Sequence, residues 1–95
     1  MQKNTLTNPL SDGDIFYTVH ERAYHVSKLL RFDPDFDAYH VMIYAPVDRE
    51  PTAADLPSLK LLMLHAPIDR AGFENPKVIA HAPVTDDDLE GYRTY

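Results

Sequence analysis

The sequence contains no cysteine, no tryptophan and only three glycines among its 95 residues. Without cysteine, disulfide bonds and thiolate zinc sites are excluded. Long hydrophobic runs are also missing, since the aliphatic stretch Leu61–Leu64 is far shorter than the roughly 20 residues that a membrane-spanning helix requires. Residues 1–13 have no apolar core of the kind found in signal peptides, and we therefore expect a cytoplasmic protein with no membrane partner.

Basic residues are scarce relative to acidic ones. Nine Lys and Arg accompany fifteen Asp and Glu, which gives a net charge of −6. Binding to nucleic acid depends on neutralising phosphates with basic side chains, so we expect no nucleic-acid partner. A basic protein partner fits this charge better, because complementary fields speed encounter. A negative net charge also serves solubility, and that simpler interpretation stays open.

Length and composition indicate one globular domain. A hydrophobic content of 44%, with six tyrosines and four phenylalanines, is typical of a folded chain. Residues 1–12 are polar and run through Pro9 into Gly13. This composition predicts a flexible N-terminal tail at 1–12 and a single domain at 13–95.

The first third of the domain carries two competing periodicities. Its apolar and polar residues alternate with period two, and its residue types are largely β-branched and aromatic, as in strands. We predict two strands, at 14–20 and 23–32, joined by a tight turn at Glu21-Arg22, although favoured hairpin turns use Gly or Asn. Apolar residues at helical spacing leave one helix at 15–30 as the alternative.

Three further strands are predicted downstream, at 38–46, 59–67 and 77–84, where apolar residues alternate or cluster between Pro-, Gly- and Asp-containing loops. The predicted strands are seven to ten residues long, which is typical of strands in globular proteins. Parallel crossovers normally need a dozen or more residues, a length that the connection at 47–58 reaches and the nine residues at 68–76 barely do, so we expect antiparallel pairing.

Two short helical segments are expected beside the strands. Thr52 can cap one turn at Ala53–Leu56. Thr85 followed by Asp88 resembles a capping box and predicts a short C-terminal helix, which Gly91 weakens. The elements together predict a mainly β protein, with α+β as the alternative: a five-stranded, strongly bent antiparallel sheet or a small barrel, with a short C-terminal helix.

The opening of the domain resembles a known family. The stretches "GDIF" (13–16), "YHVSKLL" (24–30) and "YHVMIY" (39–44), with an acidic turn before the last, are similar to the first strands of SH3-like small barrels, including some bacterial toxin-immunity families. This resemblance covers residues 13–46 and implies a barrel fold and an immunity or inhibitor role. It carries over no functional residue, and fold alone does not fix function.

A ring residue followed by Ala-Pro ends three of the predicted strands, at 44–46, 65–67 and 81–83. Proline cannot donate to a β-ladder, and the residue before it is held extended. The repeated Ala-Pro therefore predicts a stop signal at which each strand runs to its last residue and ends.

The same endings also suggest a site. His65, His81 and Asp69 have the ligand types needed to hold a divalent metal or to move a proton. A small ligand- or metal-binding domain, or an enzyme, is therefore the alternative function. That interpretation requires His65 and His81 to be neighbours, which paired antiparallel strands do not provide.

Four tyrosines lie on predicted strands. Half-exposed on one sheet face, they would form a binding patch, because tyrosine is favoured at interface hot spots; otherwise they are core residues. We predict a small non-enzymatic protein-binding module of immunity or inhibitor type, without metal or cofactor, that docks a basic protein. A homodimer that buries a sheet edge is a further alternative. The candidate binding residues are Tyr17, Tyr24, Tyr39 and Tyr44.

Overall fold

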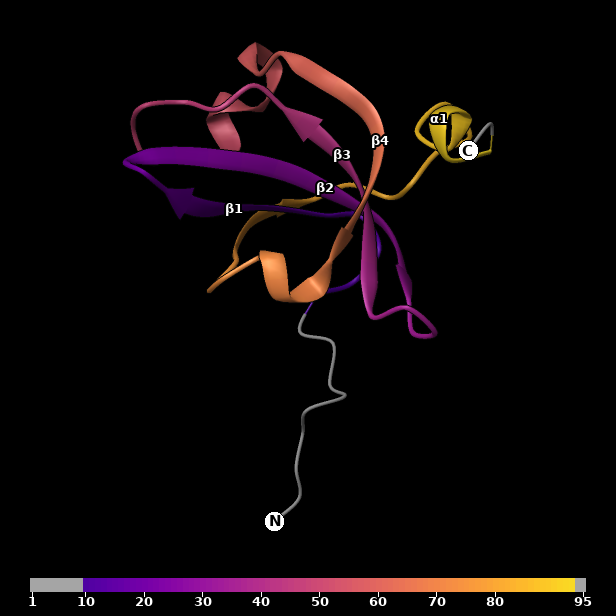
Figure 1. Cartoon of the computed structure of the whole chain (residues 1–95). Helices are drawn as coiled ribbons and strands as arrows, with labels where there is room; N and C mark the ends of the chain where they lie inside the picture. Colours follow the sequence, from indigo (N-terminus) through magenta and orange to yellow (C-terminus); the bar gives the residue numbers. More distant parts are fainter. Residues whose placement is uncertain (1–9, 94–95) are drawn as a thin grey trace.

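The computed structural model describes residues 10–93, and five antiparallel strands form a single sheet within them (Figure 1). The strands are β1 (Asp14–His20), β2 (Ala23–Asp33), β3 (Ala38–Tyr44), β4 (Leu61–Asp69) and β5 (Lys77–His81). From edge to edge their order is β4-β3-β2-β1-β5. The mainly β prediction is thus confirmed. The alternative of one helix at 15–30 is wrong, because that segment forms β1 and β2.

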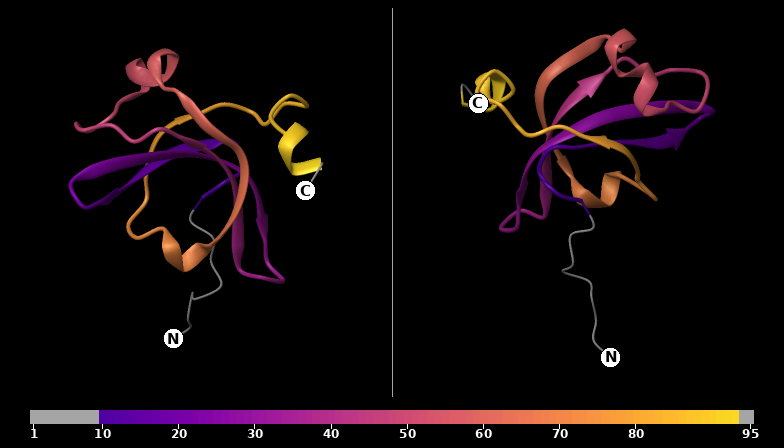
Figure 2. Two further views of the ribbon diagram at one scale, coloured as in Figure 1. Left: turned by 45° about the horizontal axis from the view of Figure 1, so that its top comes forward. Right: turned by 180° about the vertical axis from the view of Figure 1, so that it is seen from behind.

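Strands that follow one another in the chain pair with each other, except the last. β5 returns to pair with β1, where Asp14 lies opposite His81, and β4 and β5 are therefore the two edges. Register shifts interrupt three of the ladders. Such irregularities bend and twist strands, and the sheet is strongly curved (Figures 1 and 2). A small barrel is not confirmed, because β4 and β5 do not pair within residues 10–93.

The turn between β1 and β2 lies at Glu21 and Arg22, as predicted. Their φ angles are 51° and 68°, and positive φ at both central residues is typical of a type I′ turn, whose twist matches that of the strands. Neither residue is Gly or Asn, so each left-handed conformation costs on the order of 1 kcal/mol. His20 and Ala23 pair directly beside the turn, and the ladder that they begin offsets this local cost.

The sheet carries an apolar core on each face, because successive residues of β1 point to opposite sides. The first core comprises Leu10, Phe16, Leu29, Tyr39 and Val41, and the second is built on Ile15, Tyr17 and Val26. Leu10 falls within the expected tail yet is buried against the first core. Residues 1–9 of that expected tail lie outside the described residues.

Three short helical segments complete the fold. The 3-10 helix η1 (Ala53–Ser58) begins after Thr52, whose backbone N–H donates to Asp55 Oδ2 at 2.8 Å. The 3-10 helix η2 (Arg70–Gly72) and the helix α1 (Glu90–Arg93) follow. The helical turn predicted after Thr52 is confirmed. No helix among residues 10–93 has the length and apolar character to span a membrane.

The predicted capping box at the C-terminus is confirmed. The backbone N–H of Asp88 donates to Thr85 Oγ1 at 3.1 Å, and the backbone N–H of Thr85 donates to Asp88 Oδ2 at 3.0 Å. The α-helix itself begins only at Glu90, because a turn occupies the residues between. The C-terminal helix is therefore present but spans four residues.

Residues 82–93, which we call the C-terminal strap, run from the β5 edge to β4 across the face of the sheet that carries the second core (Figure 2). Midway, Lys28 on β2 donates to Asp88 Oδ2 at 2.7 Å. At the far end, a Cβ placed on Gly91 would lie 3.0 Å from Leu64 Cβ. Glycine therefore lets α1 approach β4 closely, which explains a residue of low helix propensity at this position.

Two of the three Ala-Pro pairs end strands as predicted. β3 ends just before Ala45-Pro46, and β5 ends just before Ala82-Pro83. Pro67, however, lies inside β4, opposite His40, and the predicted stop is wrong there. β4 is an edge strand, with no neighbouring strand on one side of its backbone, so a missing N–H on that side costs no ladder hydrogen bond.

Candidate functional site

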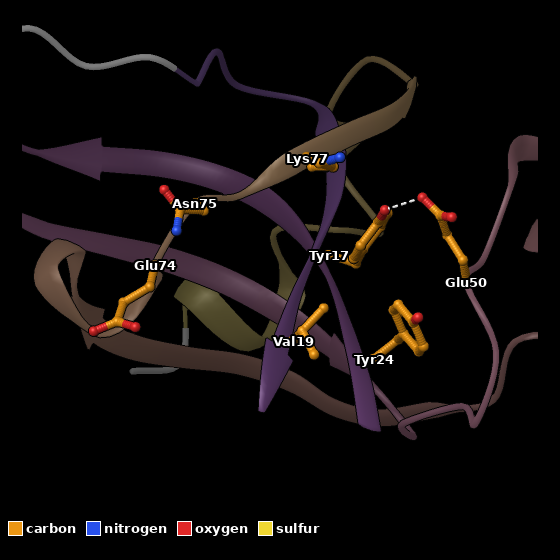
Figure 3. A pocket seen from close by; sticks show the side chains of 7 residues that line it. All are labelled: Tyr17, Val19, Tyr24, Glu50, Glu74, Asn75 and Lys77. Atoms are coloured by element: carbon orange, nitrogen blue, oxygen red, sulfur yellow. Dashed lines mark hydrogen bonds between the residues drawn. The ribbon is translucent and has the colours of Figure 1, made fainter. Parts of the chain in front are cut away.

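A hollow of about 390 Å³ lies where β1, β2 and β5 meet the loop that follows β3 (Figure 3). We call it the tyrosine pocket. Cross-strand pairing positions its floor: Tyr17 is opposite Lys77 on β5, and Val19 is opposite Tyr24 on β2. The lining side chains are Tyr17, Val19, Tyr24, Glu50, Glu74, Asn75 and Lys77.

Tyr17 is fixed by two contacts. Its ring lies edge-on to that of Tyr24, with centroids 5.5 Å apart and an interplanar angle of 69°, an arrangement that aromatic pairs favour. Its hydroxyl donates a hydrogen bond to the carboxylate of Glu50 (Figure 3). That bond, burial and the charge of Glu50 raise the pKa of Tyr17 to about 12. The phenol therefore stays a neutral donor at physiological pH and orients Glu50 in the pocket.

The pocket carries more negative than positive charge. Glu50 and Glu74 contribute two carboxylates, and Lys77 contributes one ammonium group. Within residues 10–93, neither Glu74 nor Lys77 has an ion-pair partner. Carboxylates beside aromatic rings attract ammonium and guanidinium groups, because charge and ring quadrupole act in the same direction. The arrangement is thus chemically suited to a cation.

The four candidate tyrosines do not form one exposed face. Tyr17 and Tyr24 share the pocket, but Tyr39 belongs to the first core, on the other side of the sheet, with 1% of its surface exposed. Tyr44 is half-buried against the second core. Core packing is therefore the role of Tyr39 and, at 4% exposure, of most of the Tyr17 side chain; Tyr17 and the half-buried Tyr24 both line the pocket.

The structure does not bring His65 and His81 together. They lie on β4 and β5, which are opposite edges of the sheet. His81 Nδ1 is 3.0 Å from Asp14 Oδ1, whereas His65 Nε2 is 2.7 Å from His40 Nδ1. No group of three or more His, Asp or Glu side chains within residues 10–93 is arranged to hold a metal ion. The joint site of His65, His81 and Asp69 is therefore not formed.

A histidine cluster beneath α1 escaped the sequence analysis. The rings of His40 and His65 are stacked, with centroids 4.9 Å apart, and Tyr92 of α1 stands edge-on to them at 5.0 and 5.4 Å. Asp33 Oδ2 lies 3.9 Å from His40 Nε2. A hydrogen bond between two imidazoles needs at least one neutral ring to accept it. The cluster therefore holds α1 against β3 and β4 while the rings are not both charged.

This cluster predicts a loss of stability on mild acidification. Burial, and then the neighbouring His40, lower the pKa of His65 below its usual 6.5. The unfolded chain then binds the proton more readily, so the stabilisation is complete above about pH 6.5 and is lost as the pH falls through the lower pKa of the folded state. We expect the Tm to fall between pH 7.5 and pH 5, as measured by circular dichroism.

Substitution identifies the group responsible. We expect His65→Gln to flatten this pH dependence, because glutamine does not titrate. His20→Gln is the matched control, since the side chain of His20 is 74% exposed at the end of β1. A pH profile that is the same in the wild type and in His65→Gln would contradict the assignment.

These features define a small, open-sheet β protein with an acidic, tyrosine-lined pocket on one face. No protein-family model, curated protein or solved structure matches the chain. The resemblance of residues 13–46 to SH3-like barrels therefore stays a prediction.

Proposed function

We propose that this protein is a non-enzymatic protein-binding module whose tyrosine pocket receives a lysine or arginine side chain of a basic partner. The observation that carries the proposal is the presence of two tyrosines and two glutamates around one hollow of about 390 Å³. Ligand pockets typically enclose about 300–1,000 Å³. The volume is at the lower end of this range and suits a single long side chain rather than a large ligand.

The lining of the pocket favours one cation. Tyr24, which is half-buried, supplies most of the accessible aromatic surface, and the hydroxyl of the buried Tyr17 holds the Glu50 carboxylate in place before any ligand arrives. Such preorganisation reduces the entropic cost of binding. Lys77 offsets one of the two carboxylates, so the pocket lining keeps one net negative charge. One ammonium or guanidinium group balances that charge.

The charge of the whole chain supports the same kind of partner. A net charge of −6 attracts a basic protein over distances of about one Debye length, and this attraction raises the rate of encounter. An immunity or inhibitor protein that covers a basic partner acts by docking of this kind and needs no chemistry of its own. The resemblance of residues 13–46 to toxin-immunity families implies a role of this kind.

A titration followed by ¹H–¹⁵N NMR tests the proposal. The probes are three short Gly-Ser peptides that carry a central arginine, lysine or glutamine. We expect saturable shifts at the amides of Val19, Tyr24 and Lys77 with the two basic peptides and none with the glutamine peptide. Glu50→Gln should weaken binding about three- to tenfold, because a charged contact in an aromatic site contributes on the order of 1 kcal/mol.

A charge-matched variant separates the pocket from the overall field. Asp35→Asn removes one negative charge from the exposed turn between β2 and β3, far from the pocket lining. We expect it to leave the affinity within about twofold. Equal weakening by Glu50→Gln and Asp35→Asn, or shifts spread evenly over the surface, would show that only net charge acts and would refute the pocket.

A further inference from the structure

β4 begins with a run of large apolar residues at the edge of the sheet. Between 44% and 64% of the surface of each is exposed. We call this run the apolar edge; it consists of Leu61, Leu62, Met63 and Leu64. Lys60 directly precedes this run. The next Asp, Glu, Lys or Arg along the chain is Asp69, at the end of β4.

Natural proteins rarely leave such an edge uncovered, because exposed apolar edge strands associate. A run of large, exposed apolar side chains on one strand often marks an interface. The other edge of this sheet differs: β5 has five residues, begins with Lys77 and exposes Val78 at 48%. The two edges thus provide an interface candidate and a natural comparison.

We propose that the apolar edge is the interface of a two-fold symmetric homodimer, in which β4 of one copy lies antiparallel against β4 of the other. The charges at the ends of β4 are self-complementary, with a lysine before the strand and an aspartate at its end, and this pattern favours a second copy as the occupant. Two chains of net charge −6 repel wherever their acidic surfaces meet. Residues 61–68 of β4 carry no Asp, Glu, Lys or Arg, so two copies approach there without that penalty.

The charges at the two ends of β4 select the antiparallel orientation. Lys60 precedes the strand and Asp69 ends it, and neither has an ion-pair partner within the described part of the chain. Antiparallel alignment brings Lys60 of each copy to the strand end that carries Asp69 of the other, whereas parallel alignment would bring like charges together. Arg70 does not compete, because it makes two hydrogen bonds to Asp37.

Side chains, rather than an extended ladder, make this contact. Register shifts flank the pairing of Ile43 with Met63, and Pro67 has no N–H to donate. α1 also reaches β4 where Gly91 approaches Leu64. A ladder continuing from one copy into the other along all of β4 is therefore prevented. With Lys60 opposite Asp69, residues 61–64 of each copy instead pack against residues 65–68 of the other, and the two-fold axis makes this contact self-complementary.

Sedimentation velocity of the full chain over about 1–500 µM tests the proposal, because a dimer's population follows mass action. We expect the mass to approach twice the 10.8 kDa of the chain as concentration rises. Leu62→Glu should raise the dimer Kd at least about 100-fold, since symmetry places both new carboxylates in one apolar interface. Val78→Glu makes the same change on β5 and should leave the Kd within about twofold.

A charge exchange tests the orientation independently. Lys60→Asp alone, or Asp69→Lys alone, puts like charges at both ends of the interface and should weaken the homodimer about fivefold or more. An equimolar mixture of the two variants restores opposite charges at both ends. We expect native mass spectrometry to show the mixed dimer as the main species, at an affinity near that of the wild type.

The outcomes are decisive in either direction. A chain that stays monomeric at every concentration overturns the proposal, as does a dimer that Val78→Glu dissociates as readily as Leu62→Glu. A dimer that the mixture of charge variants does not restore overturns the antiparallel arrangement. None of these substitutions touches the lining of the tyrosine pocket, so the result is independent of the proposed binding function.

Discussion

Replacing Asp88 by asparagine is expected to lower the free energy of unfolding by about 3 kcal/mol. The Asp88 carboxylate accepts a hydrogen bond from Lys28 Nζ at 2.7 Å, and the two side chains are 17% and 7% exposed. Neutralising Asp88 leaves the Lys28 ammonium buried beneath the C-terminal strap, with the Pro83 carbonyl 3.3 Å away as an acceptor. Removing one partner of such a pair costs more than removing both, because a buried charge is left uncompensated. Urea unfolding measures the loss.

Two further variants make this expectation specific. Asp86→Asn removes a carboxylate from the same turn, but that side chain is 91% exposed, and its ion pair with Arg93 contributes less than about 1 kcal/mol. Adding Lys28→Met to Asp88→Asn removes the stranded charge and should recover most of the lost stability. A double variant that is less stable than Asp88→Asn alone would contradict the buried-charge explanation.

The same ion pair affects stability in acid. Burial opposes ionisation of Asp88, but the hydrogen bonds from Lys28 and from the Thr85 backbone outweigh it and hold the pKa of Asp88 below its usual value. Its stabilisation is therefore complete above about pH 4 and is lost as the pH falls through the lower pKa of the folded state. His65 loses its contribution at higher pH, so the two contacts that hold the strap should fail at different acidities.

Local patterns in the sequence predicted most of the elements. The limits of β1 and the turn at Glu21-Arg22 follow from the alternation of apolar and polar residues on either side of these two positions. The capping box of Thr85 and Asp88 spans three residues, so the sequence contains all of it. Such features depend on neighbours in the chain and can be read without knowing the tertiary structure.

The arrangement of the strands depends on distant contacts and was not predictable in the same way. β5 pairs with β1, so that Asp14 meets His81 across 67 positions of sequence, and no local pattern encodes this. The register shift between β2 and β3 changes which residues share a face, and Tyr39 on β3 and Tyr17 on β1 lie on opposite sides of the sheet. The contact between His40 and His65 follows from the pairing of β3 with β4, and it could have been expected only from that pairing.

The candidate site shows the same division. Tyr17 and Tyr24 were named because they lie on strands, but Glu50 lies in the connection after β3, and its role appears only when that loop reaches Tyr17.

The pocket and the apolar edge lie toward opposite edges of the sheet, β5 and β4. A dimer through β4 would therefore carry two tyrosine pockets on its outer sides, and a partner with two basic segments of suitable spacing would bind with a gain in avidity.

Gly13→Ala is expected to destabilise the fold by about 2–4 kcal/mol. Gly13 has a φ of +94°, and a Cβ there would lie 2.6 Å from the Ala82 carbonyl oxygen and 2.9 Å from His81 Cε1. Its backbone is also engaged on both sides: its N–H donates to the Leu29 carbonyl at 2.7 Å, and its carbonyl accepts from the Ala82 N–H at 3.0 Å. Both backbone strain and a clash with main-chain atoms therefore oppose a side chain, and relieving the clash would separate β1 from the end of β5.

Gly72→Ala is the matched control, because a Cβ there would lie 3.4 Å from Ile68 Cγ2, an ordinary contact, and its φ is not positive. We expect a change within about 1 kcal/mol, in the stabilising direction if the unfolded chain loses freedom. Equal losses in both variants would refute the argument from close approach.

The strap begins at Ala82, so displacing Ala82 should also loosen the contact of Lys28 with Asp88. The double variant Gly13→Ala/Asp88→Asn should then lose less free energy of unfolding than the sum of the losses in the two single variants. A double-mutant cycle measures this difference.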